Sequence, residues 1–313
     1  MSRFLDRTEV FDPRSHSLAI GRSLLASAEM TVLISSPDRV LFGSGPYGSY
    51  GTLCTGLGRA SLWCAFGSTN QALHLASTVA ILVLVGVMVG FRPQWLCIPH
   101  WYVAFSLATR TTVLNGGDAV AQILTLLLIP CCLGDRRAWQ WSHPTERLAP
   151  TWSGSSYAAV LLLRCQLAGI YLEAAVSKLA HASWRQGKAM PAILLGDPLF
   201  ALTGNARELV EQVFTLAWTK TAMSLSVIGI ELAIGGAILG RAGIRRLALA
   251  LVILLHAAII LAMGLFSFGL IMIAAMVVAS MPTRYTPSRL LRPAWAGDRA
   301  SDTVRFHERE MHP

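Results

Sequence analysis

A glutamate and a lysine lie five residues apart in the stretch YLEAAVSKLAHASWRQGKAM, which covers residues 171–190. Glu173 stands within an apolar, helix-forming run, and Lys178 stands where that run gives way to polar residues. Because burial disfavours an ammonium ion, a lysine in a partly dry site can act as a neutral base. Glu173 could tune or orient such a base. The alternative is a lysine that extends to the lipid headgroups.

Three further polar residues lie at the edge or in the middle of apolar runs and are candidate substrate contacts. The stretch NGGDAVAQ places Asn115 and Asp118 where a helix is expected to begin. An aspartate there can cap the free N–H groups of the helix, and the two glycines allow close approach of another helix or a headgroup. His256, in LVILLHAAII, is either a satisfied interior histidine or a ligand or proton-relay group.

Charged side chains inside apolar segments need partners, because an unpaired charge in hydrocarbon is costly. Arg22 and Glu29 are seven residues apart and therefore share one face of a helix. We expect both to face the bundle and pair with other helices. Arg164 lies in the middle of LLLRCQLAGIYLEAA, where an acidic partner such as Glu29 or Glu231 is expected and a substrate contact is the functional alternative.

The six cysteines show no metal-binding pattern. Cys54 and Cys64 share one loop and are a candidate disulfide if that loop faces an oxidising compartment; spacing alone leaves the pairing open. The HxxxH, HExxH and CxxC spacings, the GxSxG elbow and the phosphate-binding GxxxxGK[ST] motif are all missing. We therefore predict no metal site.

The composition places the chain in a membrane. Its 313 residues are 54% hydrophobic and only 14% charged, and the mean hydropathy is +0.53. Soluble domains carry about 25% charged residues. The net charge of +9 comes from arginines scattered in short loops, without the basic stripe that nucleic-acid binding requires. These numbers predict an all-α, polytopic transmembrane helix bundle without a large soluble domain.

Apolar runs predict about eight spans, since one span takes roughly 20 residues. They cover residues 15–35, 71–91, 94–111, 118–134, 155–177, 213–240, 246–263 and 265–281. The boundary between the last two, near MGLFSFG, is open.

Eight spans place both ends of the chain on one side, and the arginine-rich short loops predict that this side is cytoplasmic. The expected parts are an N-terminus over 1–14, a transmembrane domain over 15–285 and a tail over 286–313. The loops 36–70 and 178–212 are then outside. Within the second loop, PAILLGDPLF is too short to span and is expected to be a re-entrant or interfacial segment.

Several blocks together resemble the sporulation-delaying protein B family of bacteria. They are NGGDAVAQILTLLLIPCCLGDRRAWQW, YLEAAVSKLAHASWRQGKAM, LHAAIILAMGLFSFGLIMIA and PHWYVAFSL, and the resemblance covers about residues 15–285. That family is similar in turn to the horizontally transferred transmembrane domain, a group that includes vitamin K-dependent gamma-glutamyl carboxylases.

The resemblance implies a multi-pass protein of the bacterial cell membrane. It also implies that the protein acts together with a small sporulation-delaying protein A-like partner to mature a secreted peptide toxin from its precursor. In the carboxylases, a motif similar to VSKLAHASWRQG carries the lysine that deprotonates a reduced quinone; this lysine corresponds to Lys178, and the following tryptophan and glycine correspond to Trp184 and Gly187. Lys178 and Glu173 are thus the catalytic candidates, and Trp184 joins the substrate contacts.

Three functions compete on this basis. The first is a maturation factor for an exported antimicrobial peptide. The second is a quinone-linked, carboxylase-like enzyme with Lys178 as its base and a membrane quinone as cofactor. The third is a non-catalytic immunity or receptor protein. The large lumenal domain with which the carboxylases bind their peptide is missing from this sequence, and no residue matches their second catalytic histidine.

Overall fold

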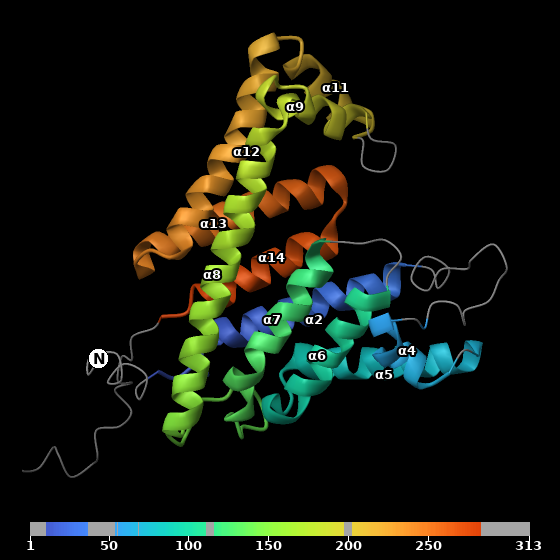
Figure 1. The fold of residues 1–313 in the computed structure, drawn as a ribbon, viewed down its shortest axis with the longest axis vertical. Helices are drawn as coiled ribbons and strands as arrows, with labels where there is room; N and C mark the ends of the chain where they lie inside the picture. The colour runs from blue at the N-terminus through green and yellow to red at the C-terminus, as the bar shows by residue number, and fades with distance from the viewer. Residues whose placement is uncertain are drawn as a thin grey trace, which may run out of the picture. The chain divides into compact units, whose positions relative to one another are not determined.

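The structure, a computed structural model, describes residues 11–36, 54, 56–67, 69–110, 116–196 and 202–282, and all described residues belong to one compact unit that ends at Thr283. Every helix predicted from the sequence is present (Figure 1). They are α2 (His16–Ser35), α5 (Asn70–Val89), α6 (Pro93–Arg110), α7 (Gly116–Leu133), α8 (Pro150–Ala180), α12 (Ala217–Ile238), α13 (Ala242–Met263) and α14 (Phe266–Ala279). Within these ranges no strand forms, so the all-α fold class is confirmed.

The helix ends follow from local sequence. The hydroxyls of Ser15 and Thr69 accept hydrogen bonds from N–H groups in the first turns of α2 and α5. Pro150 begins α8, where its missing N–H has no cost. Gly90 and Gly264 end α5 and α13 with φ of 86° and 68°, a left-handed conformation that glycine adopts freely. Gly264 thereby settles the open boundary as two helices.

Among the residues that the structure describes, six helices, rather than the eight predicted, are long and apolar enough to cross a membrane: α2, α5, α7, α8, α12 and α13. The two remaining helices, α6 and α14, are present but do not meet these requirements for length and apolarity. α6 contains Pro99 and His100 and is less apolar, and α14 has 14 residues, about 21 Å of helix against a hydrocarbon thickness of about 30 Å. We therefore correct the span count to about six.

The short helix α14 is packed on four sides, against α2, α7, α8 and α13. Small residues permit this. A Cβ added at Gly21 of α2 would lie 2.4 Å from Val278, so glycine is required for α2 and α14 to approach so closely. A second apolar cluster joins α2 to α5 and α6. The bundle is therefore organised around a helix that is too short to span.

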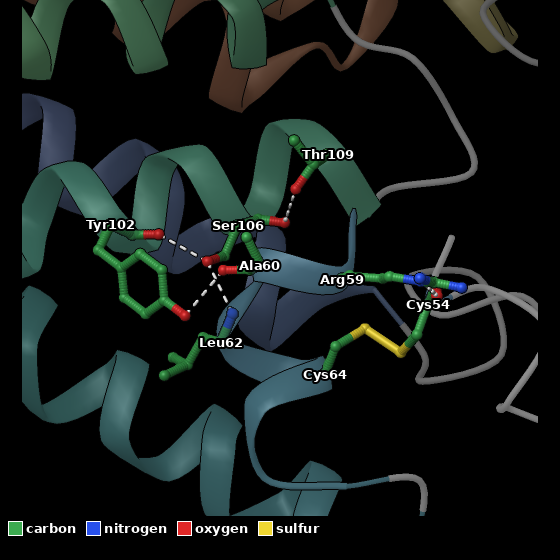
Figure 2. Close-up of a disulfide and its surroundings, with 8 residues drawn as sticks. All are labelled: Cys54, Arg59, Ala60, Leu62, Cys64, Tyr102, Ser106 and Thr109. Atoms are coloured by element: carbon green, nitrogen blue, oxygen red, sulfur yellow. Dashed lines mark hydrogen bonds between the residues drawn. A yellow bond between two sulfur atoms is a disulfide. The ribbon is translucent and has the colours of Figure 1, made fainter. Parts of the chain in front are cut away.

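One loop segment after α2 is fastened to α6. Cys54 and Cys64 form a disulfide, with 5.9 Å between their Cα atoms. Between them lies the short 3-10 helix η2 (Gly56–Ala60), and α4 (Leu62–Ala65) follows. Figure 2 shows the phenolic hydroxyl of Tyr102 donating to the carbonyl of Ala60, and the N–H of Leu62 donating to the hydroxyl of Ser106. The disulfide and these bonds fix the segment on the end of α6.

A second group of short helices connects α8 to α12. It contains α9 (Ala182–Arg185), α10 (Ala189–Pro191), the π-type helix η3 (Ala192–Gly196) and α11 (Gly204–Val213). The predicted segment PAILLGDPLF begins in α10 and η3, and its last four residues lie outside the described ranges. This group lies at the end of the bundle where α8 ends and α12 begins (Figure 1).

Candidate functional site

Lys178 forms an ion pair with Glu231 of the neighbouring helix. The Nζ atom lies 2.8 Å from Oε1 and 3.0 Å from Oε2 of the carboxylate. The lysine side chain is 23% exposed and the glutamate side chain 10% exposed. The pair therefore stands at the edge of the packed interior, with the lysine drawn inward to a carboxylate instead of outward to headgroups.

The pair depends on the close packing of α8 against α12, which lie side by side (Figure 1). Gly235 lies one turn after Glu231 on α12. A Cβ added at Gly235 would lie 2.8 Å from the side chain of Leu172 on α8. Glycine at this position lets the two helices approach until the side chain of Lys178 reaches Glu231.

The third member of the site is Trp184 of α9. The Nζ atom of Lys178 lies 5.4 Å from the centroid of the Trp184 ring, within the range of a cation–π interaction. The structure thus brings together two of the residues singled out in the sequence, Lys178 and Trp184. It adds Glu231, which the sequence indicated only as a candidate partner of Arg164.

Gly187 allows the segment that follows Trp184 to pack closely on α12. Its φ is +72°, and a Cβ there would lie 2.6 Å from the backbone nitrogen of Thr221. We expect Gly187→Ala to destabilise the protein by about 2–4 kcal/mol, since alanine adds both backbone strain and a clash with a backbone atom. Thermal unfolding of purified protein in detergent measures this.

Gly196→Ala is the matched control for Gly187→Ala. Gly196 lies in the same group of short helices, a Cβ added there would meet no atom within 4 Å, and its backbone is not in the left-handed region. We expect a change below about 0.5 kcal/mol. Equal stability of the two variants would contradict the role given to Gly187.

The structure does not support Glu173 as the group that orients Lys178. Residues five apart on an α-helix point about 140° away from each other. Glu173 is accordingly exposed on another face of α8, and Glu231 of α12 takes the carboxylate role that the sequence analysis gave to Glu173.

Among the described residues Arg164 forms no ion pair with an acidic residue, contrary to the prediction. Its Nε donates to the carbonyl of Ala279 at 2.8 Å, and its Nη2 donates to that of Met281 at 2.6 Å. Carbonyl groups at a helix C-terminus have no partner within the helix. Because α14 is short, its C-terminus lies beside the middle of α8, and the buried Arg164 caps it there.

The two charged residues of α2 are buried, as predicted. Arg22 donates to the side-chain oxygen of Gln140 at 2.8 Å. A carboxylate oxygen of Glu29 lies 3.2 Å from Nε2 of His100 on α6, and the two atoms form no hydrogen bond. Neither residue is therefore available to Arg164 or to the site around Lys178.

His256 and Tyr171 form a second buried contact, between α13 and α8. The Tyr171 hydroxyl lies 2.9 Å from Nε2 of His256, and the ring of Phe268 contacts the imidazole edge-on with 5.2 Å between ring centroids. Tyr171 is seven residues before Lys178 and shares its face of α8. His256 is thus a satisfied interior histidine at Nε2, and it lies outside the group formed by Lys178, Glu231 and Trp184.

The two candidates at the start of α7 have different outcomes. Asp118 is buried in the first turn of α7. Next to it, a Cβ at Gly117 would lie 3.1 Å from the Cα of Phe268, so this end of α7 packs directly on α14. Asn115 lies outside the described residues. The structure does not bring Asp118 into the group around Lys178.

The ion pair holds an amine and a carboxylate in direct contact. These are two of the group types that proton transfer to or from a bound substrate requires. Among the described residues, no group of three or more histidines, cysteines or acids could hold a metal ion.

The chain is similar to two proteins of Bacillus subtilis (strain 168). It is 27% identical to the sporulation-delaying protein SdpB over 249 residues, which is 79% of this chain and 76% of SdpB. This similarity supports an SdpB-like family. It is also 31% identical to the uncharacterized protein YitO over 188 residues, 59% of this chain and 60% of YitO. No protein-family model matches the chain, and no solved structure is significantly similar to it.

The similarity to SdpB agrees with the resemblance found in the sequence and covers more than three quarters of each chain. The structure contains several long apolar helices. These helices and the similarity to SdpB are both consistent with a multi-pass membrane protein. The wider relation to the horizontally transferred transmembrane domain and to gamma-glutamyl carboxylases stays a prediction.

Proposed function

We propose that this protein acts in a sporulation-delaying peptide system as a membrane-embedded maturation factor. The observation that carries the proposal is the similarity to SdpB over 79% of the chain. Lys178 and Glu231 are the working pair, because they are in direct contact where the end of α8 packs on α12. The substrate is a secreted peptide precursor, and a small sporulation-delaying protein A-like partner completes the machinery.

In this proposal Lys178 acts as the base toward the bound peptide, and Glu231 binds the ammonium group that results. Trp184 covers the lysine with its ring and limits its motion. A membrane quinone does not enter the proposal, which depends on the contacts of Lys178 with Glu231 and Trp184. We derive no step through that cofactor.

Mass spectrometry of the secreted peptide tests the proposed function. The precursor and the small partner are expressed from the same genome with and without this protein. We expect a mature form with a distinct mass only when this protein is present. An identical mass in both samples, combined with protection of cells that express this protein alone, would replace the proposal with an immunity function.

We further propose that the protein lies in the bacterial plasma membrane with both termini in the cytoplasm. The loop that holds the Cys54–Cys64 disulfide is then outside, where disulfides persist. Four of the six cysteines are free, and three of these are buried.

The disulfide provides a test of this orientation. A membrane-impermeant reductant applied to intact cells is expected to release two thiols, counted as two additional maleimide–polyethylene glycol adducts after denaturation. A Cys54→Ser/Cys64→Ser double variant is the control and should gain none. Release of the two thiols only after cell lysis would place the loop inside and reverse the orientation.

A further inference from the structure

The helix α11 separates apolar from polar residues cleanly. At about 100° per residue, Ala206, Leu209, Val210 and Val213 fall within an arc of about 100°. Arg207, Glu208 and Glu211 lie on the opposite side. A surface helix of a globular protein normally turns such an apolar stripe toward the core.

In this protein the apolar stripe of α11 does not face the core. No residue of α11 is buried, and Leu209 and Val213 are 61% and 45% exposed. One polar residue of α11 holds the helix to the preceding segment: Arg207 donates to the carbonyl of Leu195 in η3 at 3.0 Å and pairs with Glu211 of α11 itself at 2.8 Å. Glu208 and Glu211 are exposed. The apolar face of α11 therefore points away from the chain that carries it.

We propose that α11 lies in the interface of the membrane, with Leu209 and Val213 inserted at the boundary between headgroups and acyl chains. The exposed apolar surface continues beyond α11 through Leu216 and Trp218, which are 54% and 68% exposed. Trp218 stands in the first turn of α12, a helix long and apolar enough to span. Tryptophan is enriched at this depth of a membrane.

The dimensions of α11 fit a helix that lies on the membrane and does not cross it. Ten residues make about 15 Å of helix, half the thickness of the hydrocarbon layer. The helix carries one arginine and two glutamates, so apolar insertion, not attraction to anionic lipid, is the driving force. Its outward apolar face and the lipid-facing side of α12 then form one continuous surface.

This placement sets the depth of the neighbouring pair. The short helices α9, α10 and η3 connect Lys178 to α11. On α12, Glu231 follows Trp218 by about 20 Å of helix. With α11 and Trp218 in the interface, the Lys178–Glu231 pair therefore lies deeper than the headgroups, within the span of α12. The inference about α11 itself depends only on the exposure of its residues and not on the proposed chemistry.

Site-directed spin labelling in nanodiscs of phosphatidylcholine tests the inference on the full chain. Leu209→Cys and Val213→Cys report on the apolar face, and Glu208→Cys, on the polar side of the same helix, is the matched control. All are made with Cys165→Ser, because Cys165 is the exposed free cysteine. We expect nitroxides at residues 209 and 213 to collide several-fold more with oxygen than with a water-soluble nickel complex, and the reverse at residue 208.

Two outcomes would overturn the inference. Equal, high access of the nickel complex to all three labels would mean that α11 stands in water. Labels at residues 209 and 213 shielded from both oxygen and nickel would mean that a protein covers the apolar face.

Discussion

Replacing Lys178 with arginine is expected to abolish the mature peptide while the protein remains folded and inserted. Arginine preserves the positive charge and can still bind the carboxylate of Glu231, but it does not give up its proton in a protein. Proton transfer by a positioned side chain typically accelerates a reaction by about 10²–10⁴-fold. We expect the yield of mature peptide, measured by mass spectrometry, to fall by roughly 10²-fold or more.

Lys178→Met tests the same residue with the charge removed. This variant leaves the carboxylate of Glu231, 10% exposed, without its partner. Removing one member of a fully buried pair costs about 3–5 kcal/mol, and the partial exposure of Lys178 reduces this to about 1–3 kcal/mol. Adding Glu231→Gln removes the second charge. We therefore expect the double variant to regain the abundance of the parent but not the mature peptide.

The matched control for these variants is Lys188→Met. Lys188 is exposed, lies ten residues after Lys178, and forms no ion pair among the described residues. Normal product from Lys178→Arg would remove proton transfer by Lys178 from the mechanism and leave the ion pair with a structural role. Loss of product in Lys188→Met as well would show that positive charge at this end of the bundle, not one amine, is needed.

The sequence predicted the helices well because hydrocarbon imposes a simple condition on them. Each of the eight apolar runs became a helix, and the ends differ by only a few residues, as for α8, expected over 155–177 and found over 150–180. The number of spans was wrong for a different reason. Apolarity indicates burial in lipid or in protein equally, and α14 is apolar because four other helices surround it.

The partners of the polar residues were harder to predict. A family motif in the sequence indicated Lys178 and Trp184 as site residues. The spacing of Arg22 and Glu29 predicted that both are buried. The sequence could not supply Glu231 as the partner of Lys178, because the two meet only when α8 and α12 pack in one register. A spacing signal was present: Arg164, Tyr171 and Lys178 follow each other at intervals of seven and so form one stripe of α8. Each of them contacts a different helix or helix end.

Replacing Arg164 with methionine is expected to destabilise the bundle strongly. The guanidinium of Arg164 forms two hydrogen bonds to the carbonyls of Ala279 and Met281. Hydrogen bonds from charged donors contribute about 1.5–3 kcal/mol each, and a buried carbonyl left without a partner costs about 1–3 kcal/mol. We expect a loss of about 3–5 kcal/mol, seen as a fall of about 10 °C or more in the thermal midpoint in detergent.

Arg246→Met is the control for Arg164→Met, because Arg246 is an exposed arginine in the first turn of α13. We expect the thermal midpoint of Arg246→Met to equal that of the parent protein. Arg164→Lys should fall between the two, since an ammonium group is a point donor and cannot reach both carbonyls as the planar guanidinium does. If Arg164 caps α14, the thermal midpoint should be lowest with methionine at this position, higher with lysine and highest with arginine. A structural role through charge alone would instead make lysine equal to arginine, and equal midpoints for Arg164→Met and Arg246→Met would mean that the end of α14 is satisfied without Arg164.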